Sequence, residues 1–263
     1  MPSRLTLISP EFIEQYSKAC PVNWSAVVRN LKTRSTYTTE DFEYYIIASS
    51  LFSSKIEGNS LDLNSFMNNR GQKTTAKKKE FQEIEDLVGA YRFAAEHKLT
   101  QANSLKVHQM LAKTLLKGTE RGKYRKTQVG VFDNTTGRPV YLAVEPEFVK
   151  QEVSKLFADI AILLERNLSS KEIFYYASMI HLWVAMIHPF ADGNGRMARL
   201  VEKWFLASKL GASAWSINTE KYYWDHRQKY YKNISLGYNY YTLKWERCIP
   251  FLLMLPEALK QPI

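Results

Sequence analysis

The segment Ile180–Lys203, IHLWVAMIHPFADGNGRMARLVEK, decides how this chain folds. An apolar helix that runs from about Ile173 is expected to end near His188. The reason is Pro189, which disfavours helical geometry in the residue before it and lacks the N–H of a helical hydrogen bond. A second helix, Arg196–Lys209, is expected after the glycine-rich turn. The sequence therefore predicts a helix–loop–helix unit with His188 at a helix end.

The turn between these helices has the composition of an anion site. Gly193 and Gly195 can adopt positive φ and bring backbone N–H groups close to a ligand, at the positive end of the next helix dipole. Arg196 and Arg199 follow three residues apart on one helix face. Because cations there oppose the dipole, a negative group is expected in front of them, and a polyphosphate fits best. Asp192 is placed to hold a Mg²⁺ ion that bridges such phosphates.

Helical periodicity also dominates the rest of the chain. Apolar residues recur at three- and four-residue steps within 42–52, 81–91 and 148–160, which predicts three amphipathic helices. Thr39 followed by Glu43 predicts the cap of the first of these helices, and Glu145-Pro146 marks the start of the third.

One segment departs from the helical pattern. In Lys126–Val144, short β-branched or aromatic runs flank the turn-rich residues 133–137, which predicts a β-hairpin. The polar, cationic stretch Asn68–Lys79 is the best candidate for a boundary between an N-terminal helical region, 1–75, and a main body, 76–263. The predicted fold class is mostly α with one β-hairpin.

Composition excludes several classes of protein. The chain has 263 residues, of which 45% are hydrophobic and 24% charged, so it is expected to be globular rather than disordered. Its aliphatic runs are too short to span a bilayer, and its N-terminus does not resemble a secretory signal, so the cytoplasm is the expected location. The two cysteines are far apart and expected to be reduced. A net charge of +10 leaves nucleic acid, phosphate-rich ligands and acidic partners open.

His188–Arg199, HPFADGNGRMAR, resembles the HPFx[D/E]GNGRxxR signature of Fic-domain proteins and fills every defined position. The resemblance covers roughly Glu83 to Met254, including the hairpin and a Tyr230-Tyr231…Thr242…Trp245 pattern similar to the C-terminal helices of that family. It implies a Fic-type helical bundle with one β-hairpin flap at about 128–144. It also implies transfer of AMP from ATP to a Tyr, Ser or Thr hydroxyl of a target protein, with release of pyrophosphate.

The resemblance assigns a role to most residues of the motif. His188 would be the general base, and Asp192 would hold Mg²⁺. Backbone groups of Gly193–Gly195 and the Asn194 side chain would cradle the α-phosphate, while Arg196 and Arg199 would bind the β- and γ-phosphates. The implied ATP-binding residues are Asp192, Gly193, Asn194, Gly195, Arg196, Met197, Ala198 and Arg199 in the motif, Val131, Phe132, Asp133 and Asn134 in the flap, and Tyr230 and Tyr231 near the adenine. Tyr238 stands where many relatives have Asn, which puts the adenine contacts in doubt.

A second stretch, Ser53–Asn59 (SSKIEGN), resembles the [S/T]xxxE[G/N] inhibitory motif of the same family, with Ser53 and Glu57 at its defining positions. An acid in the last turn of a helix is unfavourable against the dipole unless it is compensated. Arg199 is the natural compensator, and in the family this pair blocks placement of the γ-phosphate. The resemblance therefore implies autoinhibition by an N-terminal helix at about 39–58.

Other interpretations remain open at this point. The chain could instead remove AMP from modified targets, or be a weakly catalytic regulatory or nucleic-acid-associated binding protein that uses a Fic core. His181 is expected to be a satisfied core histidine, and Tyr230 and Tyr231 could equally be packing residues. The expected partners are ATP and a target protein docked on the flap. A homodimer is left open, a membrane is not expected, and nucleic acid is expected only indirectly.

Overall fold

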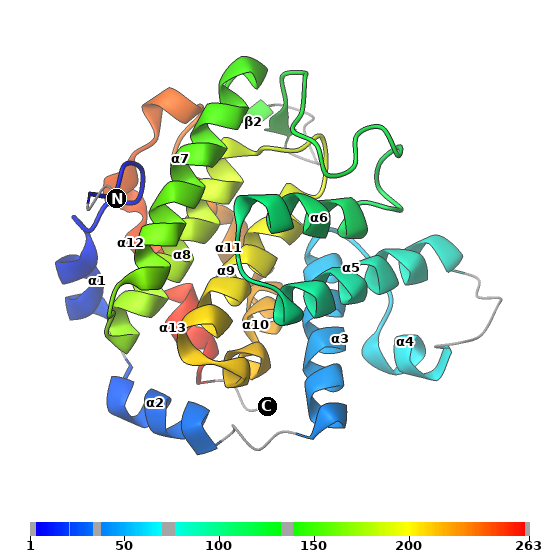
Figure 1. The fold of residues 1–263 in the computed structure, drawn as a ribbon, viewed down its shortest axis with the longest axis horizontal. Helices are drawn as coiled ribbons and strands as arrows, with labels where there is room; N and C mark the ends of the chain where they lie inside the picture. Colours follow the sequence, from blue (N-terminus) through cyan, green and yellow to red (C-terminus); the bar gives the residue numbers. More distant parts are fainter. Residues whose placement is uncertain (1–3, 21, 34–37, 70–76, 133–138, 261–263) are drawn as a thin grey trace.

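The computed structural model describes residues 4–20, 22–33, 38–69, 77–132 and 139–260 (Figure 1). The chain is mostly helical with one two-stranded sheet, which confirms the predicted fold class. The α-helices are α1 (Ile13–Ala19), α2 (Trp24–Thr33), α3 (Thr39–Ile56), α4 (Leu63–Asn69), α5 (Lys78–Glu96), α6 (Gln101–Leu111), α7 (Pro146–Glu165), α8 (Ser170–Ile187), α9 (Asn194–Leu210), α10 (Thr219–Asp225), α11 (Arg227–Ile234), α12 (Ile249–Leu252) and α13 (Met254–Ala258).

Helices α8 and α9 form the predicted helix–loop–helix unit at the centre of the molecule. Helix α8 is apolar on all sides, and α1, α7, α9 and α12 pack around it. It begins slightly before the predicted start, at a capping box in which Ser169 and Glu172 exchange hydrogen bonds. It ends at His188, which adopts the left-handed conformation with φ 52° and ψ 60°. This conformation is uncommon for a residue with a side chain and turns the chain sharply into the glycine loop.

The hairpin forms where it was predicted. Strand β1 (Gly130–Phe132) pairs antiparallel with β2 (Pro139–Leu142), and Val131 lies opposite Tyr141. The Tyr141 hydroxyl donates a 2.7 Å hydrogen bond to the carbonyl oxygen of Met186, which fixes the hairpin to the last turn of α8. The predicted flap residues Asp133 and Asn134 lie outside the described residues.

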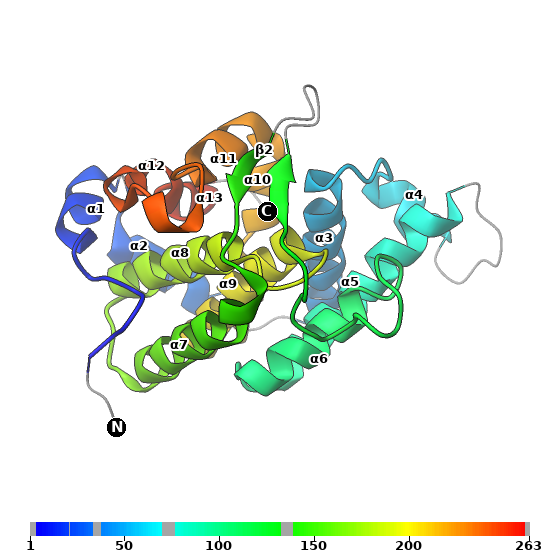
Figure 2. The same ribbon diagram turned by 90° about the horizontal axis from the view of Figure 1, so that it is seen from above.

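Helix α3 is an integral part of the core. Its apolar residues Ile46, Ile47, Leu51 and Ile56 are at most 1% exposed and belong to the same hydrophobic cluster as α8 and α9. It packs against α5, α10 and α9, as Figures 1 and 2 show from two directions. The division of the chain at 68–79 stays a prediction, but apolar residues from both sides of it pack in one core.

The start of α3 differs from the prediction. Thr38, not Thr39, is the N-cap, because its side-chain oxygen accepts from the N–H of Asp41 while Asp41 accepts from the N–H of Thr38. A capping box requires the acid three residues after the cap, and the Thr39–Glu43 spacing of four does not satisfy it.

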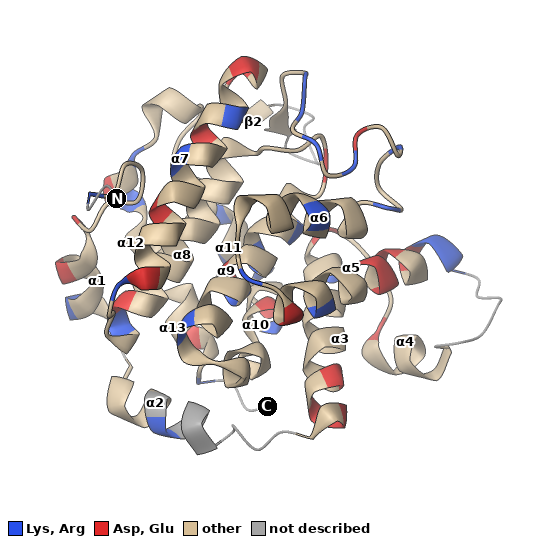
Figure 3. Ribbon diagram, in the orientation of Figure 1, with Lys and Arg blue, Asp and Glu red and all other residues tan. Residues whose placement is uncertain are grey.

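The C-terminal region is less regular than the resemblance implied. After α11, Thr242 and Trp245 lie in short 3-10 turns, η3 (Tyr240–Thr242) and η4 (Trp245–Arg247), rather than in α-helices; a further turn, η2 (Ala212–Ser216), follows α9. In the described residues, no helix combines the length and the apolar character that crossing a membrane requires. Figure 3 shows Lys and Arg positions spread over many elements, with Asp and Glu among them.

Candidate active site

His188 is half-buried, and the backbone orients its imidazole. Its Nδ1 atom lies 3.1 Å from the carbonyl oxygen of Ala185. A carbonyl can only accept, so Nδ1 carries the proton and Nε2 keeps its lone pair. Burial lowers the pKa of His188 below its ordinary value, against the opposing effect of the Ala185 hydrogen bond. The ring is therefore neutral near pH 7, with Nε2 able to accept a proton.

Arg125 stabilises the turn at His188 through hydrogen bonds to its backbone. Its Nε donates to the carbonyl oxygen of His188 at 2.8 Å, and its backbone N–H donates to that of Pro189 at 3.0 Å. Other guanidinium nitrogens donate to the carbonyl oxygens of Thr127 and Val144, on either side of the hairpin. One buried arginine thus fixes the loop His188–Gly193, the catalytic loop of the candidate site, relative to the hairpin. Sequence analysis missed this residue, because nothing local marks an arginine whose partners are remote carbonyls.

His108 on α6 supports the middle of the loop. Its Nδ1 accepts from the N–H of Gly122, so its Nε2 carries the proton and donates to the carbonyl oxygen of Asp192 at 3.0 Å. The ring also stacks on Phe190, with centroids 3.6 Å apart. Burial lowers the pKa of His108 to about 4, so the ring stays neutral. This supporting histidine was also missed by sequence analysis.

Asn194 closes the loop on itself. Its side-chain oxygen accepts from the N–H of Phe190 at 2.9 Å, and its side-chain nitrogen donates to the carbonyl oxygen of Phe190 at 2.8 Å. Gly193 adopts φ 81°, and a Cβ there would lie 2.9 Å from Leu111, so both the backbone and the space require glycine. The glycine loop is therefore preformed, and the Asn194 amide, predicted to contact the α-phosphate, is engaged in shaping it.

Asp192 is exposed at the tip of this loop. One of its carboxylate oxygens accepts from the N–H of Gly193 at 2.6 Å. The described residues contain no group of three metal-ligating side chains. A single exposed carboxylate next to an anion-binding loop nevertheless suits Mg²⁺, which usually binds one or two carboxylates together with substrate phosphates and waters. The donor set therefore fits a nucleotide-bound Mg²⁺ and does not fit a metal held by the protein alone.

Arg199 makes four hydrogen bonds to other described residues through its guanidinium group. Its Nη2 lies 2.7 Å from Oε1 of Glu57 and 3.0 Å from the carbonyl oxygen of Ser53, while its Nε donates to the Ser53 hydroxyl at 2.9 Å. The Arg199 side chain is 1% exposed and the Glu57 side chain 30% exposed. The structure thus joins the two motifs that the sequence predicts to interact, although they are 142 residues apart.

The contacts between α3 and α9 form a regular ladder. Ser49 accepts from Lys203 at 2.6 Å, Ser53 from Arg199, and the Glu57 carboxylate lies against Gly195. Because each helix contributes every fourth residue in opposite order, the two helices run antiparallel with their polar faces in register. A Cβ on Gly195 would lie only 2.3 Å from Oε1 of Glu57. The Glu57 carboxylate therefore lies over the start of α9, where the glycine loop leads into the helix.

The charges around Glu57 favour an anion. Burial by itself raises the pKa of Glu57, but Arg199, Arg196 and the Arg199 hydrogen bond outweigh it, so the pKa lies below its ordinary value. Arg196 is 6% exposed and pairs weakly with Glu83 at 3.5 Å. Its Nε is buried and has no hydrogen-bond partner among the described residues. A second anion could therefore satisfy a donor that the protein leaves open.

The remaining predicted residues fall into three groups. Met197 and Ala198 are buried in the core, so only their backbone could face a ligand. Val131 on β1 is 39% exposed, and the side chain of Phe132 is not described. Tyr230 is 2% exposed and its hydroxyl accepts from Nη1 of Arg199 at 3.2 Å. Tyr231 is 42% exposed and donates to the carbonyl oxygen of Ile56 at 2.9 Å, which ties α11 to the end of α3.

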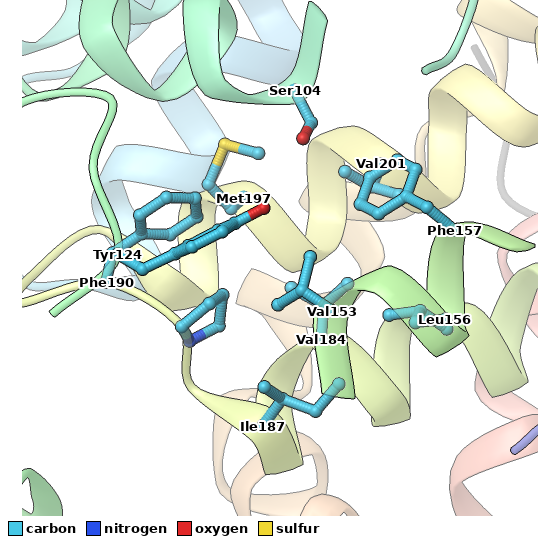
Figure 4. Close-up of a pocket in the computed structure, with 11 residues that line it drawn as sticks. Ser104, Tyr124, Val153, Leu156, Phe157, Val184, Ile187, Phe190, Met197 and Val201 are labelled. Atoms are coloured by element: carbon cyan, nitrogen blue, oxygen red, sulfur yellow. The ribbon is translucent and has the colours of Figure 1, made fainter. Parts of the chain in front are cut away.

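A small apolar pocket lies behind the catalytic loop (Figure 4). Pro189 and Phe190 form part of its wall, and side chains of α7, α8 and α9 form most of the rest. The only side-chain hydroxyls that line it are those of Ser104 and Tyr124. Such a lining offers no set of polar groups for a nucleotide, so the better candidate site is the polar face formed by His188, the glycine loop and Arg199.

Comparison with known proteins agrees with this geometry. Residues 98–206 match the Fic/DOC family model, and the matched segment contains the whole catalytic loop. A Fic family protein from Desulfovibrio desulfuricans G20 shares the fold with a TM-score of 0.72 at 23% identity, over 98% of this chain and 74% of that one. A Fic domain-containing signaling protein from Bacteroides thetaiotaomicron VPI-5482 gives 0.68 at 18% identity, over 90% and 92%.

Fic-1 from C. elegans gives a TM-score of 0.63 at 18% identity, over 95% of this chain and 71% of that one. No curated protein matches this sequence. Identities this low show a shared fold, whereas the family model matches the sequence itself. Residues 98–206 are thus similar in sequence to the Fic/DOC family, and the fold of the chain is similar to that of solved Fic proteins.

Proposed function

We propose that this protein is an autoinhibited adenylyltransferase that transfers AMP from ATP to a hydroxyl side chain of a target protein. The observation that carries the proposal is the arrangement around α9. A neutral histidine and a preformed glycine loop lie beside a buried arginine, Arg199, which is already paired with Glu57 at the end of α3. The match of residues 98–206 to the Fic/DOC family model supports nucleotidyl transfer in general. The geometry of His188, Gly195, Arg199 and Glu57 supports the more specific function.

His188 would act as the general base. The target hydroxyl would give its proton to Nε2, which keeps its lone pair because Nδ1 is committed to Ala185. As the O–H bond breaks, the hydroxyl oxygen would form a bond to the α-phosphorus of ATP. The bond from that phosphorus to the bridging oxygen would break, and pyrophosphate would leave with the electron pair.

The glycine loop and the two arginines would hold the phosphates. Backbone N–H groups at the start of α9 point along the helix axis, where the dipole favours negative charge. Arg196 would give the phosphates its unpartnered Nε. Asp192 would hold Mg²⁺, which supplies positive charge against the phosphate oxygens when ATP is bound.

Glu57 would prevent the productive arrangement. Its carboxylate lies against Gly195 and binds the guanidinium that the γ-phosphate would need. Within the described part of the chain, Arg199 uses four of its five N–H groups on Glu57, Ser53 and Tyr230, so it can offer a γ-phosphate only one N–H, on Nη1, while Glu57 is bound. ATP could then bind only with its terminal phosphate displaced, which would misalign the α-phosphate for in-line attack.

The flap would position the target. Strand β2 already pairs at Leu142 with the segment of Tyr238 and Asn239, so an extended segment of the target would add to β1, which exposes Val131. Arg125 links the hairpin to the carbonyl of His188. A hydroxyl presented by that segment would therefore have a fixed distance to the base.

The test is transfer of label from α-labelled ATP to protein, with Mg²⁺ and a cell lysate as the source of targets. His188→Ala should lower labelling by about 10²–10⁴-fold, the usual effect of removing a general base. Glu57→Gly should raise labelling above wild type. Two matched controls are His97→Ala, an exposed histidine, and Glu165→Gly, an exposed glutamate at the end of α7. Both controls should label as wild type does.

The outcomes separate the alternatives. If His188→Ala labels as strongly as wild type, His188 is not the base and the proposed mechanism fails. If Glu57→Gly labels no more than wild type while it binds ATP normally, the transferase could stand but autoinhibition by Glu57 would not. If no variant labels any protein, the binding-protein interpretation is favoured. Loss of label from a modified target in wild type alone would instead indicate AMP removal that depends on Glu57.

A further inference from the structure

A buried chain of hydrogen bonds leads from Nη1 of Arg199 to Tyr230, His181 and Glu202. The hydroxyl oxygen of Tyr230 accepts from Nη1 of Arg199 at 3.2 Å and lies 3.0 Å from Nε2 of His181. On the other side of that ring, Nδ1 of His181 lies 2.8 Å from Oε2 of Glu202. His181 and Glu202 are both fully buried, and Tyr230 is 2% exposed.

The direction of each proton in this chain can be assigned. Glu202 accepts at its carboxylate, so Nδ1 of His181 is the donor; the Tyr223 hydroxyl also donates to Glu202, at 3.0 Å. Arg199 can only donate, so the Tyr230 oxygen accepts from it and its own O–H is directed to Nε2 of His181. Burial raises the pKa of Tyr230, which keeps the phenol protonated. The chain therefore runs from the Arg199 cation through Tyr230 and neutral His181 to the Glu202 anion.

The contacts of Arg199 come from two sources. Ser53 and Glu57 belong to α3 and its C-terminal end, whereas Tyr230 belongs to α11. The contacts with Glu57 and the Ser53 carbonyl use Nη2, and the contact with Tyr230 uses Nη1. If Glu57 withdraws, Arg199 loses its carboxylate partner but keeps its bonds to Ser53 through Nε and Nη2 and its bond to Tyr230 through Nη1. Nη1 is the guanidinium nitrogen that lies close to Gly195, and Tyr230 is the residue that holds it. Without that bond, Nη1 would be free to turn away from the start of α9.

We propose that Tyr230, with His181 and Glu202 behind it, is a positioning relay that keeps Arg199 oriented for the terminal phosphate of a nucleoside triphosphate once Glu57 withdraws. This inference rests on the proposed function of Arg199 as the γ-phosphate clamp. Glu202 contributes through polarisation, because a carboxylate at the end of the chain strengthens each hydrogen bond up to the guanidinium. None of the three residues needs to touch the nucleotide.

The experiment measures binding of ATP and of ADP by calorimetry in the Glu57→Gly background, where Arg199 is released. Tyr230→Phe removes the hydroxyl and keeps the ring, so the packing against His181 and Phe251 is retained. It should weaken ATP binding by about tenfold, the order expected for one hydrogen bond to a charged group, and change ADP binding by less than twofold. The matched control is Tyr175→Phe, a buried tyrosine on α8 whose hydroxyl donates to the carbonyl of Ser9. It should leave the ratio of ATP to ADP affinity unchanged.

A coupling test separates positioning from a merely structural role. With Arg199→Ala also present, Tyr230→Phe should no longer alter ATP binding, because the relay acts only through Arg199. His181→Gln places a polar group near the Tyr230 hydroxyl and should retain more of the ATP preference than His181→Leu does. Urea unfolding of each variant checks that the affinities are those of folded protein.

The results distinguish this inference from the proposed function. If Tyr230→Phe and Tyr175→Phe give the same ratio of ATP to ADP affinity, the relay is overturned even where Glu57→Gly transfers AMP. An equal loss with and without Arg199 also overturns it. If the ATP preference depends on Tyr230 through Arg199 but no variant transfers AMP, the relay stands and the transferase fails. Failure of Glu57→Gly to prefer ATP over ADP at all would overturn the relay together with the γ-phosphate role of Arg199.

Discussion

Gly195→Ala is a substitution whose effect on stability should reverse sign when Glu57 is removed. The Cβ of alanine would lie 2.3 Å from Oε1 of Glu57, where ordinary contact begins near 3.4 Å. The carboxylate must therefore move by about 1 Å, and this movement breaks its 2.7 Å contact with Arg199. The nearest backbone does not obstruct the new methyl group, because the close atoms belong to the Glu57 and Arg199 side chains.

The expected magnitude follows from the burial of the pair. Breaking a fully buried ion pair costs about 3–5 kcal/mol and an exposed one under about 1 kcal/mol. Because Arg199 is 1% and Glu57 30% exposed at the side chain, we expect about 1–2 kcal/mol of lost stability from the pair. Alanine in a helix gains up to about 1 kcal/mol over glycine. Gly195→Ala should therefore be neutral to about 2 kcal/mol destabilising in wild type, and stabilising by up to about 1 kcal/mol beside Glu57→Gly.

The assay is urea unfolding of wild type, both single variants and the double variant, analysed as a double-mutant cycle. The coupling free energy between positions 57 and 195 should be about 1–2 kcal/mol, with equal m-values for all four proteins. A coupling below about 0.3 kcal/mol would be within the additivity expected of independent sites. That result would show that the carboxylate does not lie over the start of α9, and the geometric basis of autoinhibition would be refuted.

The further predictions concern His188, Asp192 and His108. Because burial lowers the pKa of His188, we expect the acid limb of the kcat/KM profile for transfer by Glu57→Gly to have its midpoint below pH 6.5. A midpoint at or above pH 6.5 would contradict the role of a neutral, half-buried His188 as the base. Asp192→Ala should abolish Mg²⁺-dependent transfer with little change in thermal stability, since the side chain is exposed; activity that survives both this change and EDTA would exclude the metal role. His108→Leu should cost about 2–4 kcal/mol in urea unfolding, because the N–H of Gly122 and the carbonyl of Asp192 lose their partner; a cost below 1 kcal/mol would show that the loop does not depend on it. Stability should also fall more in wild type than in His108→Leu as the pH drops from about 6.5 toward 4, because the unfolded chain binds a proton at His108 that the folded ring, with a pKa of about 4, does not.

Much of the fold could be predicted from local sequence. The end of α8 at His188 follows from Pro189, and the hairpin follows from β-branched runs on either side of a turn, because each signal depends on neighbouring residues alone. The cap of α3 was also local, yet it was missed by one position, since the decisive pair is Thr38 and Asp41. A strict search for Ser or Thr followed three residues later by an acid would have found it.

The sequence by itself determined the residues of the catalytic loop and, through the resemblance of two short motifs, the expected pairing of Glu57 with Arg199. Only the tertiary structure decided which other groups support them: Arg125 and His108 behind the loop, and the chain from Tyr230 through His181 to Glu202 behind Arg199. The physical reason is that periodicity reports which face of a helix is apolar but not which helix it meets. Hydrogen bonds across 49 or 84 residues depend on the distance and angle at which α6, α8, α9 and α11 pack, and packing brings those polar groups together inside one apolar core.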